Sequence, residues 1–134
     1  MRIVNTPLTW STTGTSTYAT SGNISSAALY SQPFSLRHMD NYAIQLVTTG
    51  ATVTGAFKLQ ASVDDPNIDP GVGYPVGSSM NWTDIDGSSI TVTVAGSLVW
   101  NAQGVGYPWV RVVWTESGTA AGAVTGRVHG KGAQ

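Results

Sequence analysis

The stretch YPWVRVVWT, residues 107–115, places an arginine inside the most apolar part of the chain. On an extended strand, neighbouring side chains point to opposite faces, so this stretch separates into two rows. One row is apolar apart from an indole N–H and is expected to face a core: Val110, Val112 and Trp114. The other row is also partly apolar, so we expect it to be covered as well: Trp109, Arg111, Val113 and Thr115.

Arg111 lies on the second row, and its charged group needs interaction partners beneath the cover. An arginine on a covered sheet face can stack on an aromatic ring and donate hydrogen bonds to a carboxylate or to carbonyl groups. The candidate carboxylates are Asp84, Asp86 and Glu116, and the sequence does not choose among them. The cover is a loop, the N-terminal segment or another subunit. Arg111 therefore either pins a loop across the sheet from inside the chain or contacts a partner.

Alternating patterns continue along the chain and predict further strands. The clearest runs are residues 42–48, 57–63, 90–94 and 124–131, and a further strand is expected near Leu36. Polar turns rich in Gly, Pro, Asn and Asp separate these runs, and helical periodicity is nearly absent. The predicted inward positions include Tyr42, Ile44, Leu46, Phe57, Leu59, Ala61, Val63, Ile90, Val92, Val94, Val124 and Val128.

Many short strands joined by polar turns are typical of an all-β protein. We predict a single domain, an antiparallel β-sandwich of jelly-roll-like type, over residues 24–134. Residues 1–23 precede it as an N-terminal arm or a first strand. Because this segment is dominated by Thr, Ser and Gly, it buries little on its own. Trp10 and Tyr18 are its expected anchors.

The chain is poor in charge. Charged residues make up 10% of its 134 residues, whereas Ser and Thr together number 31 and Gly 16; ordinary soluble domains are about 25% charged. The net charge of −1 argues against a nucleic-acid binder held by phosphate neutralisation. The absence of cysteine excludes disulfides and thiolate chemistry. With no run of about 18 apolar residues, we expect no membrane span.

A nearly neutral, hydroxyl-rich surface favours a protein that packs against copies of itself or against other partners, because isolated soluble domains usually keep more charge. The candidate interface residues combine the anchors of the arm with the second row of residues 107–115. They are Trp10, Tyr18, Trp109, Arg111 and Val113.

Catalytic and metal sites find little support in the sequence. Acidic residues gather in two loops, DDPNIDPG (64–71) and TDIDG (83–87). Such loops can offer oxygen ligands to calcium, but neither has the spacing of a known calcium loop, and Asp beside Pro or Gly is ordinary turn chemistry. His38 and His129 without cysteine argue against zinc, and no serine lies in a nucleophile motif. We expect no enzyme and no cofactor, with calcium as the one alternative.

The aromatic side chains allow a second kind of binding. Exposed aromatic rings beside Asn and Asp are how β-sandwich modules hold sugars, and the candidate glycan-binding residues are Tyr74, Asn81, Trp82 and Asp84. The alternative is structural: Trp82 and Trp100 would close the two ends of the sandwich.

Several segments, taken in order, resemble a family of small all-β virion proteins of tailed bacteriophages and prophages. They are FKLQASVDD (57–65), NWTDIDGSS (81–89), AGSLVWN (95–101), YPWVRVVWT (107–115) and GRVHGKG (126–132). The match covers about the last 80 residues and the starting MRIV. It is a pattern of strand and turn residues rather than a catalytic signature, and it is distantly similar to discoidin-like and carbohydrate-binding sandwiches.

This resemblance implies a structural role on the particle, as capsid decoration or as an element joining head, tail and fibres. The implied partners are copies of the chain, other virion proteins and, in the alternative function, host glycans, with no nucleic acid and no membrane. The implied location is the virion, after synthesis in the cytoplasm of a bacterial host. The chain departs from the family pattern by a longer loop over residues 66–80, which is a natural place for a specific contact.

Overall fold

The structure is a computed structural model that describes residues 2–15, 17–25, 27–37, 39–77, 79–103, 106–117 and 120–132. These residues form strands and loops, and no helix among them is long and apolar enough to cross a membrane. The strands, in chain order, are β1 (Arg2–Pro7), β2 (Trp10–Ser11), β3 (Gly22–Ile24), β4 (Leu29–Ser31), β5 (Phe34–Ser35), β6 (Asn41–Thr52), β7 (Gly55–Ser62), β8 (Thr83–Asp84), β9 (Ile90–Val92), β10 (Ser97–Gln103), β11 (Trp109–Glu116) and β12 (Ala121–Gly132).

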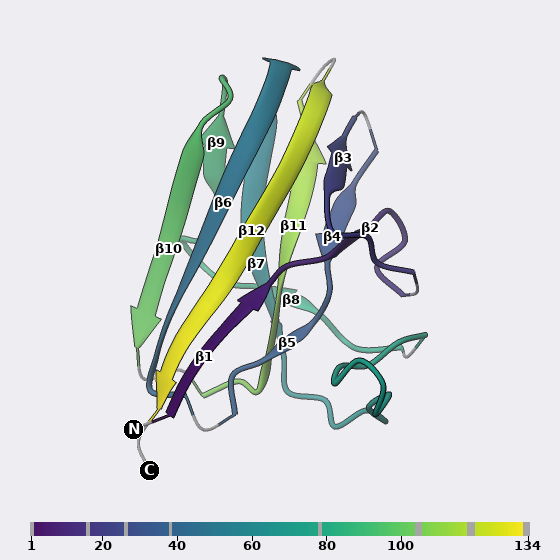
Figure 1. Ribbon diagram of the computed structural model, residues 1–134, viewed down its shortest axis with the longest axis vertical. Helices are drawn as coiled ribbons and strands as arrows, with labels where there is room; N and C mark the ends of the chain where they lie inside the picture. Colours follow the sequence, from purple (N-terminus) through teal and green to yellow (C-terminus); the bar gives the residue numbers. More distant parts are fainter. Residues whose placement is uncertain are drawn as a thin grey trace.

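Two antiparallel sheets pack face to face, which confirms the predicted all-β sandwich (Figure 1). The β6 sheet has the order β1-β12-β6-β10, with β3 also paired to β12. The β11 sheet has the order β2-β4-β11-β7-β8, with β5 beside β11 and β9 beside β7. β10 lies at one edge of the β6 sheet, and β1 lies near the other edge (Figure 1).

The core between the sheets is built from the inward rows that alternation predicts. The inward row of β11 is fully buried: Val110, Val112 and Trp114. The rows of β6, β7 and β12 meet it with Tyr42, Ile44, Leu46, Phe57, Leu59, Val124 and Val128. Phe57 and Trp114 pack with their ring centroids 4.7 Å apart. Trp100 also lies in this core, where its indole N–H donates to the Ser88 carbonyl at 2.7 Å.

Two of the predicted inward residues are wrong. Val63 is 77% exposed and Val94 is 72% exposed. The reason is the same for both, because β7 ends at Ser62 and β9 ends at Val92. Alternation holds only while the chain remains extended and paired, so it predicts nothing one or two residues beyond a strand end.

Residues 2–24 are part of both sheets rather than a separate lead-in. β1 pairs with β12 in one sheet, and β2 pairs with β4 in the other. The crossing between them is held by the Leu8 N–H, which donates to the Gly126 carbonyl at 2.8 Å, and by the Thr9 N–H, which donates to Gln32 Oε1 at 2.6 Å. The chain then loops back to Ala19, which forms a backbone bridge with Trp10.

Candidate functional site

The outer face of the β11 sheet carries an arginine held between two aromatic rings. The Arg111 guanidinium carbon lies 4.5 Å from the ring centroid of Tyr30 and 4.5 Å from that of Trp82. Tyr30 comes from β4, where it lies opposite Val113 of β11, and Trp82 immediately precedes β8. We call Arg111, Tyr30, Trp82, Gln60 and Tyr18 the arginine cluster. Its central side chain is half-buried, and burial lowers the pKa of Arg111.

A straight row of hydrogen bonds connects the cluster to a carboxylate. Arg111, Gln60 and Asp84 lie opposite one another on β11, β7 and β8. The Arg111 Nε–H donates to Gln60 Oε1 at 2.9 Å, and the Gln60 amide donates to Asp84 Oδ1 at 2.9 Å. Lys58 Nζ donates to Asp84 Oδ2 at 2.9 Å. The hydrogen bonds from Gln60 and then from Lys58 lower the pKa of Asp84.

Of the three candidate carboxylates, Asp84 therefore reaches Arg111, but through an amide rather than directly. In the part of the chain that the structure describes, no ion pair joins Arg111 to Asp84, Asp86 or Glu116. The favourable interactions of the guanidinium are two ring faces and one amide oxygen. Such an arrangement suits arginine, because the faces of its planar guanidinium can stack on aromatic rings while the N–H groups at its edge donate hydrogen bonds.

The N-terminal segment covers this cluster. Gly14 lies against it with φ of 72°, and a Cβ there would lie 3.0 Å from Arg111 Nη1 and 3.1 Å from Tyr30 Cγ. The turn that presents Gly14 is held by Ser11 Oγ, which accepts from the Thr13 and Gly14 N–H groups at 3.2 Å each. Glycine is needed here both for the left-handed backbone and for the close approach.

The 66–80 loop packs on the same segment. The Gly77 N–H donates to the Thr15 carbonyl, and the rings of Tyr18 and Tyr74 meet edge to face with centroids 5.7 Å apart. The second row of residues 107–115 is therefore covered at Trp109, Arg111 and Val113, and the cover of Arg111 comes from the same chain, whereas Thr115 is exposed. The contacts fit the interpretation of Arg111 as an internal group that pins a segment across the sheet.

Gly14 and Gly73 provide a matched pair for testing this cover. Both have positive φ, but a Cβ at Gly73 would have nothing within 4 Å. Gly73→Ala is expected to cost about 1 kcal/mol, the backbone penalty alone. Gly14→Ala is expected to cost about 2–3 kcal/mol, because the arginine stack must also shift. Urea unfolding of the two variants gives the comparison, and equal losses would show that residues 12–15 do not press on Arg111.

Two tyrosines, Tyr18 in the arginine cluster and Tyr42 in the core, make the stability of the fold sensitive to alkaline pH. Burial raises the pKa of Tyr18 to about 12, partly offset by Arg111. Burial, followed by the hydrogen bond to the Tyr107 hydroxyl at 3.5 Å, also raises the pKa of Tyr42. Both shifts favour the neutral phenol in the folded chain.

The chain is expected to lose stability above pH 10. The contribution of a phenol with a raised pKa is complete below the unfolded value of about 10 and is lost as pH rises through the folded value. Thermal unfolding midpoints measured between pH 9 and 12 should therefore fall, and Tyr18→Phe should make that fall shallower. If the two chains lose stability in parallel over this window, Tyr18 is not buried as described.

The other predicted interface residues lie inside the folded chain. Trp10, Trp109 and Val113 are at most 4% exposed, and the Arg37 guanidinium lies 5.7 Å from the Trp109 ring centroid. These three side chains offer little surface to a partner in this fold, and Tyr18 is half-buried. An interface that uses this face would have to form over the N-terminal segment rather than on the residues beneath it.

The predicted glycan-binding residues lie on the same side of the β11 sheet as the cluster. Trp82 stacks on Arg111 instead of closing an end of the sandwich, and Tyr74 joins the cluster through Tyr18. The backbone N–H of Asn81 donates to Asp64 Oδ2 at 2.5 Å. Asp84 is already bonded to Lys58 and Gln60. Of the predicted glycan-binding residues, Trp82 and Tyr74 are thus half-exposed rings, whereas the carboxylate of Asp84 already accepts hydrogen bonds within the chain.

The acidic loops act as turns and ion pairs. Asp65 pairs with Arg37 at 3.1 Å, and Asp69 Oδ1 accepts from the Gly71 N–H at 2.8 Å. Among the described residues, no three or more His, Cys, Asp or Glu side chains gather where they could hold a metal ion. His38 lies outside the described residues, and His129 Nδ1 lies 3.5 Å from the Asn5 amide.

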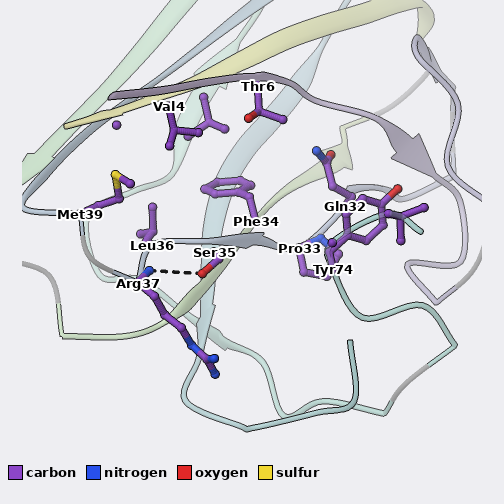
Figure 2. A pocket seen from close by; sticks show the side chains of 14 residues that line it. Val4, Thr6, Gln32, Pro33, Phe34, Ser35, Leu36, Arg37, Met39 and Tyr74 are labelled. Carbon is purple, nitrogen blue, oxygen red and sulfur yellow. Dashed lines mark hydrogen bonds between the residues drawn. The ribbon is translucent and has the colours of Figure 1, made fainter. Parts of the chain in front are cut away.

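A hollow of about 290 Å³ opens between the two sheets beside β1 (Figure 2). Val4 and Thr6 of β1 line it on one side, and Phe34 and Leu36 line it on the other. Met39 and Gln32 lie at its opposite ends, while the Arg37 side chain points away from it (Figure 2). The lining is mainly apolar, so the hollow suits an apolar group rather than proton transfer or nucleophilic chemistry.

Sequence reasoning missed two members of the cluster, Tyr30 and Gln60. Tyr30 lies in SSAALYSQ, a stretch that the pattern allows to be either a helical turn or a strand. Gln60 was placed on the outward face of its strand, and only the pairing of β7 with β11 reveals that it faces Arg111. Strand neighbours are the missing signal, because a single sequence does not give them.

The fold defines the chain as an antiparallel β-sandwich, and comparison with known proteins adds no family. No protein-family model matches the chain, and no curated protein matches it. Among solved structures, the SPBc2 prophage-derived protein YomS is similar, at 16% identity over 97% of this chain and 95% of that chain, with a TM-score of 0.43.

Two other similar structures come from different settings. A Bacillus endospore appendage protein, described as forming disulfide-linked pili, is 12% identical over 98% of this chain and 89% of that chain, with a TM-score of 0.45. The CBM22-1–GH10 modules of Clostridium thermocellum xylanase 10B are 13% identical over 98% of this chain and 26% of that chain, with a TM-score of 0.44. Because these values are low, no role is transferred from any of the three.

Proposed function

We propose that this chain is a non-enzymatic structural subunit of a bacteriophage particle, which assembles with copies of itself and with other virion proteins. The observation that carries the proposal is the contrast between the two outer faces of the sandwich. The chain covers the arginine cluster on the outer face of the β11 sheet with its own residues, through Gly14, the Gly77–Thr15 hydrogen bond and the Tyr18–Tyr74 ring contact. The outer face of the β6 sheet has no such cover among the described residues (Figure 1).

This open face carries three large apolar side chains that are exposed to solvent. Ile3, Val47 and Val99 are exposed on it, and the strand register places all three on the same side as Arg127 and Lys131. Open sheet faces usually carry alternating polar residues. A surface with exposed valines, few charges and, among the described residues, an unprotected strand edge at β10 favours association with other proteins.

The bonding of the polar groups supports a non-enzymatic role. The side chains of the polar row hydrogen-bond to one another, so these groups already have partners within the chain: Arg111, Gln60, Asp84 and Lys58. The hollow beside β1 is mainly apolar. The particle as the setting rests on the resemblance of the strand and turn segments to phage virion proteins, and the proposed location is accordingly the virion, after synthesis in the host cytoplasm.

Self-association and presence on particles test this proposal together. Sedimentation velocity of the purified chain at increasing concentration should show a rising average mass, and purified particles from the producing host should contain many copies. A chain that stays monomeric at high concentration and is absent from particles would end the proposal.

A second function, binding of host surface glycans, is favoured by one observation. Trp82, stacked on Arg111, and Tyr74, packed against Tyr18, are half-exposed rings, and flat rings can stack on sugars. Titration with a broad panel of oligosaccharides should then change the tryptophan fluorescence, and Trp82→Ala should abolish the change. A flat titration across the panel would rule this function out.

A further inference from the structure

β10 differs from the other strand edges of the molecule in being long and unprotected. It pairs with β6 in an unbroken register from Ser97 to Gln103, and in Figure 1 it is the outermost strand of the sheet. Natural edges are usually short, or carry charge or proline, because a free edge is a template for pairing. The other described edges follow this rule: β2, β5 and β8 have two residues, β3 and β9 have three, and β1 contains Arg2 and Pro7.

The hydrogen-bonding groups on the free side of β10 can be identified from the start of the strand. The Gly96 carbonyl accepts from the Thr48 N–H at 2.8 Å, so the backbone of Gly96 faces β6. Along an antiparallel strand this direction alternates from one residue to the next. The N–H and C=O groups of Ser97, Val99 and Asn101 therefore face away from β6.

The side chains of β10 suit contact with a copy of the same strand. Between Asp86 and Arg111 the sequence contains no Asp, Glu, Lys or Arg, so no like charges would meet. On the outer face, Val99 is 54% exposed between Ser97 and Asn101. On the inner face, Leu98 is half-buried beside the buried Trp100.

We propose that two copies of the chain pair antiparallel through β10 about a two-fold axis at Val99. This inference rests on the proposed function and names the surface through which the subunit associates. Val99 of one copy then lies opposite Val99 of the other, and Ser97 of each lies opposite Asn101 of its partner. The outward backbone groups of these residues bond across the axis, which joins the two β6 sheets into one.

Side-chain packing adds to the backbone pairing on both faces of the joined sheet. Val47 lies on β6 opposite Ser97, on the same outer face as Val99. The two Val99 side chains lie opposite each other and each Val47 lies diagonally beside its own Val99, so the four valines form a diagonal strip across the axis. On the inner face, Leu98 of one copy lies opposite Trp100 of the other, which covers the open side of each core. A strand edge is a small interface, so the pair is weak in isolation and gains strength when many copies are held on one particle.

Disulfide formation tests the register directly, because the chain has no cysteine of its own. Directly opposite residues in a hydrogen-bonded antiparallel pair have Cα atoms about 5.5 Å apart, which is within disulfide range. Val99→Cys should form a disulfide-linked dimer under mild oxidation at least tenfold faster than Val63→Cys, whose position is also highly exposed but lies just beyond the end of β7, away from β10. Equal rates for the two variants would overturn the inference.

The Val99→Lys variant tests the β10 interface separately from the proposed function. Sedimentation should show that Val99→Lys weakens self-association at least tenfold, since two lysines meet at the axis, whereas Val63→Lys does not. If the wild type and Val99→Lys associate equally, self-association does not use the β10 edge, but the proposed function stands. If the wild type itself does not associate and is absent from particles, the proposed function fails, and the pairing fails with it.

Discussion

Replacing Arg111 with alanine is expected to lower the free energy of unfolding by about 3 kcal/mol and to leave self-association unchanged. The change removes the stacking on Tyr30 and on Trp82 and the hydrogen bond to Gln60. A partly desolvated cation–π contact contributes about 1–2 kcal/mol, and a hydrogen bond to a charged group about 1.5–3 kcal/mol. The expected loss is smaller than the sum of these contributions, because in the variant water takes the place of some of the lost interactions.

Two further variants show which property of Arg111 matters. Arg111→Lys keeps the charge but cannot present a flat group to two rings, so it should lose most of the same free energy. Asp84→Asn should lose much less, because Asp84 is exposed and reaches Arg111 only through Gln60. Urea unfolding and sedimentation measure both quantities. An Arg111→Ala chain of unchanged stability that no longer associates would place the guanidinium in an interface between chains.

Replacing Trp114 with alanine should cost about 4 kcal/mol, because it leaves a large cavity in the core. Trp114 is fully buried against Phe57, and the backbone of Gly55 approaches so closely that a Cβ there would lie 2.6 Å from its ring. The indole N–H also donates to the Ser25 carbonyl at 3.3 Å. With a total stability of roughly 5–15 kcal/mol for a domain of this size, this loss is a large fraction of the whole.

Trp114→Phe is the matched control, since it keeps the ring beside Phe57 and loses only part of the volume. It should cost about half as much as the alanine change. Trp82→Ala provides the comparison outside the core, where a half-exposed ring is removed from the arginine cluster. If Trp114→Ala and Trp82→Ala cost the same, the inward row of β11 does not form the centre of the core.

Alternation within residues 107–115 was enough to predict both rows of β11. It worked because this strand stays extended, is paired with β7 along its whole length, and is also paired on its other side with β5 at Trp109 and Val110 and with β4 at Val113 and Trp114. The same reasoning was wrong at Val63 and Val94, where the strands had already ended. The existence of strands could thus be read from the pattern, whereas their ends depend on partners that the pattern does not show.

The arginine cluster could be predicted only in outline. The outward direction of Arg111 and the need for a cover follow from its strand alone. The choice of Tyr30, Trp82 and Gln60 depends on segments that are 29 or more residues away in sequence, at positions 30, 82 and 60 against 111. Residues 12–15 show no period, so nothing in them indicates that they cover the cluster. The free edge of β10 likewise depends on strand order, although its lack of charge is visible in the sequence.

Hydrogen–deuterium exchange at low and high protein concentration tests the central claim, that the β11 face is closed within the chain and that association uses the β10 edge. Peptides that cover residues 97–101 should exchange more slowly as concentration rises, because the amides of Ser97, Val99 and Asn101 become paired. Peptides that cover residues 11–15 and 109–115 should exchange at the same rate at both concentrations. Protection that grows with concentration over residues 11–15 or 109–115, and not over 97–101, would contradict the account.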